Sequence, residues 1–268
     1  MSRVDHFPST HATWIDAQLT IIDGAGGATD GPRAQVAGNA RAALRKHLWE
    51  RYHAPLRAYV HGGSLRRAGE PDDLVSGYFA ERVTTPDFLA AWRKSGMPLR
   101  RWMMNGMGFY ARGVVRDRMR DRMRTFTDLA GPGAGDRASA GDDRRADPAD
   151  DLLGADDRTA ADAFEHAWAI AVLDAAHAQV HAELDAQGRL DQYEVFRRRV
   201  IDGEGYDTIA PTVGLTAQQC AGATRLVSQR LAAALREVLR DEGVTEGEMD
   251  GAVADVQRAV GVRPMDGR

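Results

Sequence analysis

Cysteine is almost absent from this chain: Cys220 is the single one among 268 residues. One thiol cannot form an intramolecular disulfide, and it cannot supply the cysteine cluster of a structural zinc site. This usage is typical of a reducing compartment, so we expect a cytoplasmic protein. The sequence also lacks any run of the ~20 apolar residues that a membrane-spanning helix needs. Its first residues lack the apolar stretch of a secretory signal, and we expect no membrane segment.

Net charge is also low, at −4, but the charges are unevenly distributed along the chain. Residues 99–124 hold eight arginines against two aspartates, whereas residues 128–162 hold ten aspartates against four arginines. Charge that is segregated in this way indicates that the two segments have separate roles.

Helical periodicity dominates the sequence. Apolar residues recur at spacings of three and four in 40–62, 71–92, 163–188 and 190–203, which predicts helices there. The glycine-rich stretch 19–31 resembles a phosphate-binding loop, but Thr29 stands where its third glycine would be, so a flexible connector is favoured. Residues 128–160 combine Gly, Pro, Ala and Asp with few large apolar side chains. We therefore predict an all-α fold of two helical domains joined by an acidic flexible linker.

A helix-turn-helix is predicted for 206–231. Gly214 supplies the turn residue, and Thr216 with Gln219 forms a capping box at the start of the second helix. Small or apolar residues then recur at helical spacing at Cys220, Ala223, Val227 and Leu231. A tight helical hairpin without a nucleic-acid role is the alternative.

The stretch 99–120 crowds arginines together with Trp102, Phe109 and Tyr110. Opening and holding a nucleic-acid strand needs cations for the phosphates and aromatic faces for the bases, and this composition supplies both. The alternative is a core helix that also carries arginines.

Four segments, in this order, resemble the bacterial sigma factors of the extracytoplasmic-function type, particularly a long variant found in planctomycete-like genomes: 48–63, 70–83, 99–120 and 206–239. The resemblance implies a protein of the bacterial cytoplasm that binds core RNA polymerase and directs it to promoter DNA. It divides the chain into an N-terminal extension (1–39), a region 2-like domain (40–127), the linker (128–160), a region 4-like domain (161–240) and a C-terminal extension (241–268).

Carried over position by position, the resemblance assigns three sets of residues. The polymerase-binding set is Asp72, Asp73, Leu74, Ser76, Phe79, Glu81 and Arg82. The set that reads and melts the −10 element is Arg100, Arg101, Trp102, Asn105, Phe109, Arg112 and Arg116. The set for the −35 element is Thr216, Gln218, Gln219, Arg225, Gln229 and Arg230, and it is poorer in cations than is usual in the family.

No catalytic residues, cofactor or metal are expected. His177, His181 and Asp185 share one side of a predicted helix, but no further ligand with a characteristic spacing completes a metal site. An anti-sigma factor or another protein regulator is a further candidate partner. Two alternative functions remain open: a degenerate sigma-like adaptor, and a stand-alone helix-turn-helix regulator without initiation activity.

Overall fold

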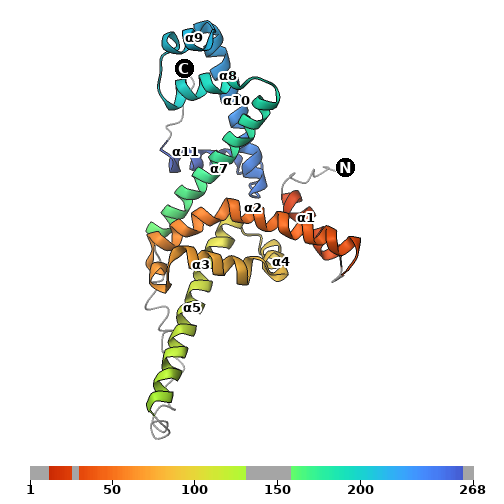
Figure 1. The fold of residues 1–268 in the computed structure, drawn as a ribbon, viewed down its shortest axis with the longest axis vertical. Helices are drawn as coiled ribbons and strands as arrows, with labels where there is room; N and C mark the ends of the chain where they lie inside the picture. The colour runs from red at the N-terminus through yellow and green to blue at the C-terminus, as the bar shows by residue number, and fades with distance from the viewer. Residues whose placement is uncertain (1–11, 26–29, 131–157, 262–268) are drawn as a thin grey trace, which may run out of the picture. The chain divides into compact units, whose positions relative to one another are not determined.

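A computed structural model describes residues 12–25, 30–130 and 158–261, which are helical with no β-strand among them (Figure 1). The all-α prediction is therefore confirmed. The chain divides into two compact units. The first unit comprises residues 18–168, and the second comprises residues 1–17 together with 169–268.

The first unit is built around two long helices and the short elements between them. In chain order its elements are α2 (Pro32–Gly62), η1 (Ser64–Ala68), α3 (Pro71–Tyr78), η2 (Phe79–Val83), α4 (Pro86–Ser95) and α5 (Leu99–Ala130). The ends of α1 (Ala12–Gly24) and α7 (Arg158–Ala186) add to it. Helices α2, α3 and α4 each begin with proline, whose fixed φ suits the first helical position.

The core of this unit follows the predicted apolar spacing. On α2 the side chains of Tyr52, Leu56 and Val60 are fully buried, and on α5 those of Met103 and Met107 are too. These stripes are what hold the elements together, because burial of a large apolar side chain contributes about 1.5–3 kcal/mol.

The second unit contains the two helices and the turn expected within 206–231. Its elements are the remainder of α7, then α8 (Leu190–Phe196), η4 (Arg197–Ile201), α9 (Tyr206–Val213), α10 (Ala217–Asp241) and α11 (Met249–Ala259). Helix α10 is the hub, since α8, α9 and α11 all pack against it. The hydrogen bond from the Leu215 N–H to the Ala210 carbonyl (3.1 Å) closes the turn after α9, where Gly214 has a φ of 69°.

Several expected boundaries fall inside helices. The boundary at residue 40 lies within α2, where buried Ala37 and Ala40 already belong to the packed face. The expected linker, 128–160, lies largely outside the described residues; α5 continues to Ala130 and α7 begins at Arg158. The flexible connector expected at 19–31 is wrong for residues 19–24, which form the end of α1. Burial of Leu19 and Ile22 stabilises the helix there.

Candidate nucleic-acid interface

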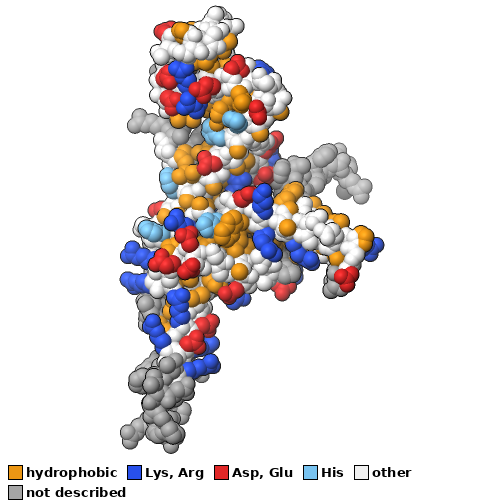
Figure 2. All heavy atoms as spheres, in the orientation of Figure 1, with side chains coloured by type: hydrophobic (Ala, Val, Ile, Leu, Met, Phe, Trp, Pro, Cys, Tyr) orange, Lys and Arg blue, Asp and Glu red, His pale blue; other side chains and the backbone are white. Residues whose placement is uncertain are grey.

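Helix α5 has two faces of opposite character. Its buried stripe runs through Leu99, Met103, Met107, Ala111 and Val115. A second stripe follows the opposite side at the same helical spacing, and we call it the α5 face: Arg101, Asn105, Phe109, Arg112 and Arg116. Arg101, Asn105 and Arg116 are exposed, and Arg112 is half-buried. Basic side chains, with some acidic ones among them, line the part of α5 that runs past α3 (Figures 1 and 2).

Phe109 is the aromatic centre of the α5 face. Its side chain is 70% exposed, the highest exposure among the large apolar residues of the described chain. The Arg112 guanidinium lies 5.8 Å from the ring centroid, within the range of a cation–π contact. An exposed ring beside a cation can accept a stacked base while the cation meets its phosphate.

Arg100 and Trp102 were predicted to share this face, and the structure places them elsewhere. The Arg100 guanidinium lies 3.6 Å from the Glu165 carboxylate and 4.6 Å from the centre of the Trp168 ring, so it serves packing against the start of α7. Trp102 is half-buried, with its ring 5.7 Å from that of Phe88. Its indole N–H is buried without an acceptor among the described residues.

Gly106 permits a close contact between α3 and α5. A Cβ at this position would overlap the Tyr78 hydroxyl and lie 3.3 Å from the Phe88 ring. That hydroxyl donates a hydrogen bond to the Met103 carbonyl at 3.2 Å. A Cβ at Gly77 would likewise overlap the Tyr110 hydroxyl, and this hydroxyl donates a hydrogen bond to the Glu81 carboxylate at 3.2 Å. Each tyrosine hydroxyl therefore fills the space beside a glycine of the facing helix: Tyr78 of α3 lies against Gly106 of α5, and Tyr110 of α5 lies against Gly77 of α3.

The other two glycines of α5 have no such crowded neighbour. The nearest atom to a Cβ at Gly108 is Arg112 Nη1 at 3.6 Å, and a Cβ at Gly113 meets no described atom within 4 Å. Packing does not explain why glycine stands at these two positions.

The expected polymerase-binding set lies on α3 and η2, and only part of it is accessible. Leu74 and Phe79 are each 3% exposed, so they belong to the core and not to the accessible part of this set. The other five side chains are exposed and form what we call the acidic face: Asp72, Asp73, Ser76, Glu81 and Arg82.

Helix α2 adds to the acidic face in a way that the sequence did not reveal. Trp49 stacks on His53 with ring centroids 4.3 Å apart, and its side chain is 37% exposed. The next residue on this side, Arg57, places its Nε 3.0 Å from the Asp72 carboxylate. Trp49 is part of the apolar spacing of 40–62, which by itself does not distinguish an exposed side chain from a buried one.

The two helices and the glycine turn predicted for 206–231 are present, around a core of Val195, Ile209, Ala210, Cys220 and Ala223. The capping box is present in both directions: the Gln219 N–H donates to Thr216 Oγ1 (3.2 Å), and the Thr216 N–H donates to Gln219 Oε1 (2.8 Å). Thr216 and Gln219 are thus engaged at the start of α10.

Only part of the expected −35 set is presented together. Arg230 donates hydrogen bonds to Glu183 (2.8 Å) and Gln187 (3.1 Å) at the end of α7. Gln218, Arg225 and Gln229 remain exposed along one side of α10. This face carries a single arginine, so it can form few phosphate contacts.

His177 and His181 pack against α8. His177 Nδ1 lies 3.0 Å from the Tyr193 hydroxyl, and the His181 ring centroid is 5.1 Å from that of Tyr193. Burial lowers the pKa of His177, and the charge of Asp174 partly opposes this. In the described parts of the chain, no group of three or more His, Cys, Asp or Glu is placed to hold a metal ion. No helix of those parts has the length and apolarity to cross a membrane.

Comparison with protein-family models, with curated proteins and with solved structures found no match to this chain.

Proposed function

We propose that this protein is a sigma-like initiation factor, which binds core RNA polymerase, directs it to promoter DNA and helps to open the −10 region. The observation that carries the proposal is the α5 face, with 70% exposed Phe109 among arginines. RNA synthesis would belong to the polymerase, so the chain itself would not be an enzyme. The bacterial cytoplasm is where such a factor would act.

The α5 face has the chemistry that strand opening needs. Stacking of one base on an aromatic side chain contributes about 1–3 kcal/mol, which is enough to offset the unstacking of a base from the duplex. Phe109 supplies the ring, and Arg101 and Arg116 supply cations for the phosphates on either side of it. Asn105, one turn before Phe109, offers hydrogen-bonding groups that suit an adenine edge.

The acidic face supports polymerase binding. Asp72 and Asp73 begin α3, where carboxylates also favour the positive end of the helix. Asp72 is already paired with Arg57, so Asp73 and Glu81 are the carboxylates of this face that would meet a basic helical partner. Exposed Trp49 beside them provides the aromatic anchor that is enriched in protein interfaces.

The helix-turn-helix supports a weaker contact with the −35 element. Because Arg225 is the one arginine exposed beside Gln218 and Gln229, we expect low affinity for duplex DNA and a shallow dependence on salt. The same observation favours a second candidate function, a sigma-like adaptor that binds polymerase without reading a promoter.

Gel filtration of the full chain with core polymerase, followed by run-off transcription from the DNA upstream of its own gene, tests the proposal. Co-elution together with transcription supports a sigma-like factor, whereas co-elution without transcription supports the adaptor. Duplex DNA binding without polymerase association would overturn both and point to a stand-alone regulator.

A further inference from the structure

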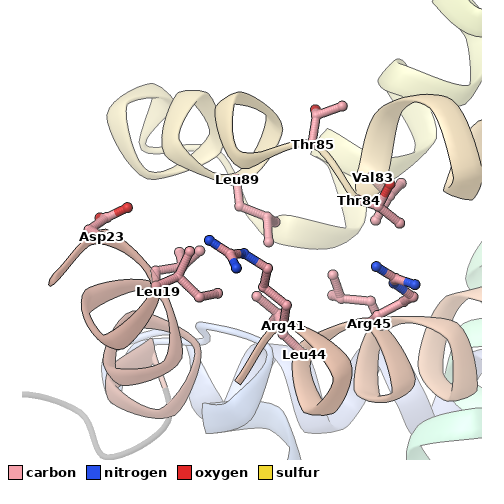
Figure 3. A pocket seen from close by; sticks show the side chains of 11 residues that line it. Leu19, Asp23, Arg41, Leu44, Arg45, Val83, Thr84, Thr85 and Leu89 are labelled. Atoms are coloured by element: carbon pink, nitrogen blue, oxygen red, sulfur yellow. The ribbon is translucent and has the colours of Figure 1, made fainter. Parts of the chain in front are cut away.

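A small hollow lies in the first unit, where α1 and α2 meet α4 and the turn before it (Figure 3). Its apolar lining comes from Leu19, Ile22, Leu44, Leu48, Val83 and Leu89. It shares no residue with the α5 face or the acidic face. An inference about it is therefore independent of the proposed function.

Two arginines stand at this hollow. Arg41 and Arg45 are one turn apart on α2, and both point from α2 toward α4 and the preceding turn (Figure 3). Both are exposed, and neither forms an ion pair with another described residue. The one carboxylate in the lining, Asp23, lies 3.8 Å from Arg93. The hollow therefore carries an uncompensated positive charge.

The remaining polar groups of the lining are already used within the fold. The Thr84 hydroxyl donates to the Ala80 carbonyl at 2.9 Å, and the Thr85 hydroxyl donates to the Arg82 carbonyl at 2.6 Å. The two guanidinium groups are thus the donors that a bound molecule would meet. Guanidinium is matched by carboxylate, with which it can form paired hydrogen bonds.

The size of the hollow limits what can enter it. Its volume is about 40 Å³. For comparison, an engineered apolar cavity of about 150 Å³ binds benzene, and sites for small-molecule ligands span about 300–1,000 Å³. The hollow can therefore take only the end of one aliphatic side chain. Further binding energy would have to come from groups outside it.

We propose that the hollow docks an acidic segment of a partner protein, which inserts one aliphatic side chain and places flanking carboxylates on Arg41 and Arg45. Charge complementarity and the small apolar volume both favour this occupant. A single side-chain anchor beside charged contacts is a common arrangement in protein recognition.

Methyl NMR of the full chain can test this with a synthetic nine-residue peptide in which glutamates flank a single leucine. We expect saturable shifts of the Leu44, Leu48 and Leu89 methyl groups. Replacing the peptide leucine by alanine, or its glutamates by glutamine, should weaken binding by about tenfold. The R41E/R45E variant should weaken binding of the original peptide to a similar extent, because its new carboxylates repel the peptide glutamates. The matched control is R33E/K46E, which reverses two exposed charges elsewhere on α2 and should change affinity less than about twofold.

Three results would overturn the proposal. The first is that the leucine methyl groups show no saturable shift at millimolar peptide. The second is an equal loss of affinity in R33E/K46E and R41E/R45E, which would show that the peptide is attracted by positive charge anywhere on α2. The third is binding of 4-methylpentanoate as tight as that of the peptide, which would make the hollow a site for a small carboxylate. Unchanged methyl spectra of the free variants away from α2 would show that they remain folded.

Discussion

Gly106 and Gly113 lie two turns apart on α5, but a side chain added at the two positions meets different surroundings. At Gly106 it would overlap the Tyr78 hydroxyl, which is fixed by its hydrogen bond to the Met103 carbonyl. At Gly113 it would meet open space. The same substitution should therefore have opposite effects.

We expect Gly106→Ala to destabilise the protein by about 1–3 kcal/mol, because the overlap outweighs the better helix propensity of alanine. Gly113→Ala should stabilise it by up to about 1 kcal/mol. Urea unfolding followed by circular dichroism measures both. Adding Tyr78→Phe to Gly106→Ala should recover part of the loss, and equal effects of the two glycine substitutions would contradict the interlocked packing.

The titration of His177 should affect stability below about pH 6.5. Burial holds its pKa below the ordinary value of 6.5, so the unfolded chain binds a proton more readily than the folded one. Stability is then lost as pH falls from about 6.5 through the lower folded pKa. We expect the thermal midpoint to fall over this window, and His177→Phe to flatten the dependence. An unchanged slope in the variant would rule out this role.

At the scale of elements, α10 depends on how it begins. Thr216 precedes the first turn of α10 and Gln219 lies within it, so the backbone N–H groups of both have no carbonyl partner in the helix. The capping box gives each of these N–H groups a side-chain acceptor. Thr216→Ala should cost about 1 kcal/mol of unfolding free energy, and Thr216→Ser should cost much less because the hydroxyl remains. Equal losses in the two variants, measured by urea unfolding, would show that the hydroxyl is not what matters.

The elements also show how far the sequence could predict this site. The turn between α9 and α10 and the start of α10 were predictable because their signals are local: Gly214, the Thr216–Gln219 pair and the spacing from Cys220 to Val227 all lie within one short stretch. The side of α5 that faces solvent is set by distant partners. Arg100 meets Glu165, and Gly106 meets Tyr78, so neither role could be inferred from the helix alone.

At the scale of the whole molecule, the proposed activities lie on different elements. The acidic face lies on α3 and η2, and the α5 face lies on another helix of the same unit. The residues proposed for a weak −35 contact lie on α10 in the second unit. Substitutions at one surface should therefore leave the others intact, and polymerase binding and promoter opening should be separable by mutation.

Phe109→Ala separates them most directly. Since the side chain is 70% exposed, its removal should change stability by less than about 0.5 kcal/mol. Val36→Ala, which removes a 53% exposed side chain from α2, is the matched control. Binding to core polymerase should be unchanged in both variants.

The decisive measurement is permanganate reactivity of −10 thymines in the promoter, with core polymerase and the wild-type, Phe109→Ala or Val36→Ala protein. We expect opening by the wild type and by Val36→Ala, and a loss of about tenfold or more with Phe109→Ala, as removal of one stacking platform implies. Unchanged opening by Phe109→Ala, or no opening by the wild-type complex, would contradict the assignment of strand opening to the α5 face.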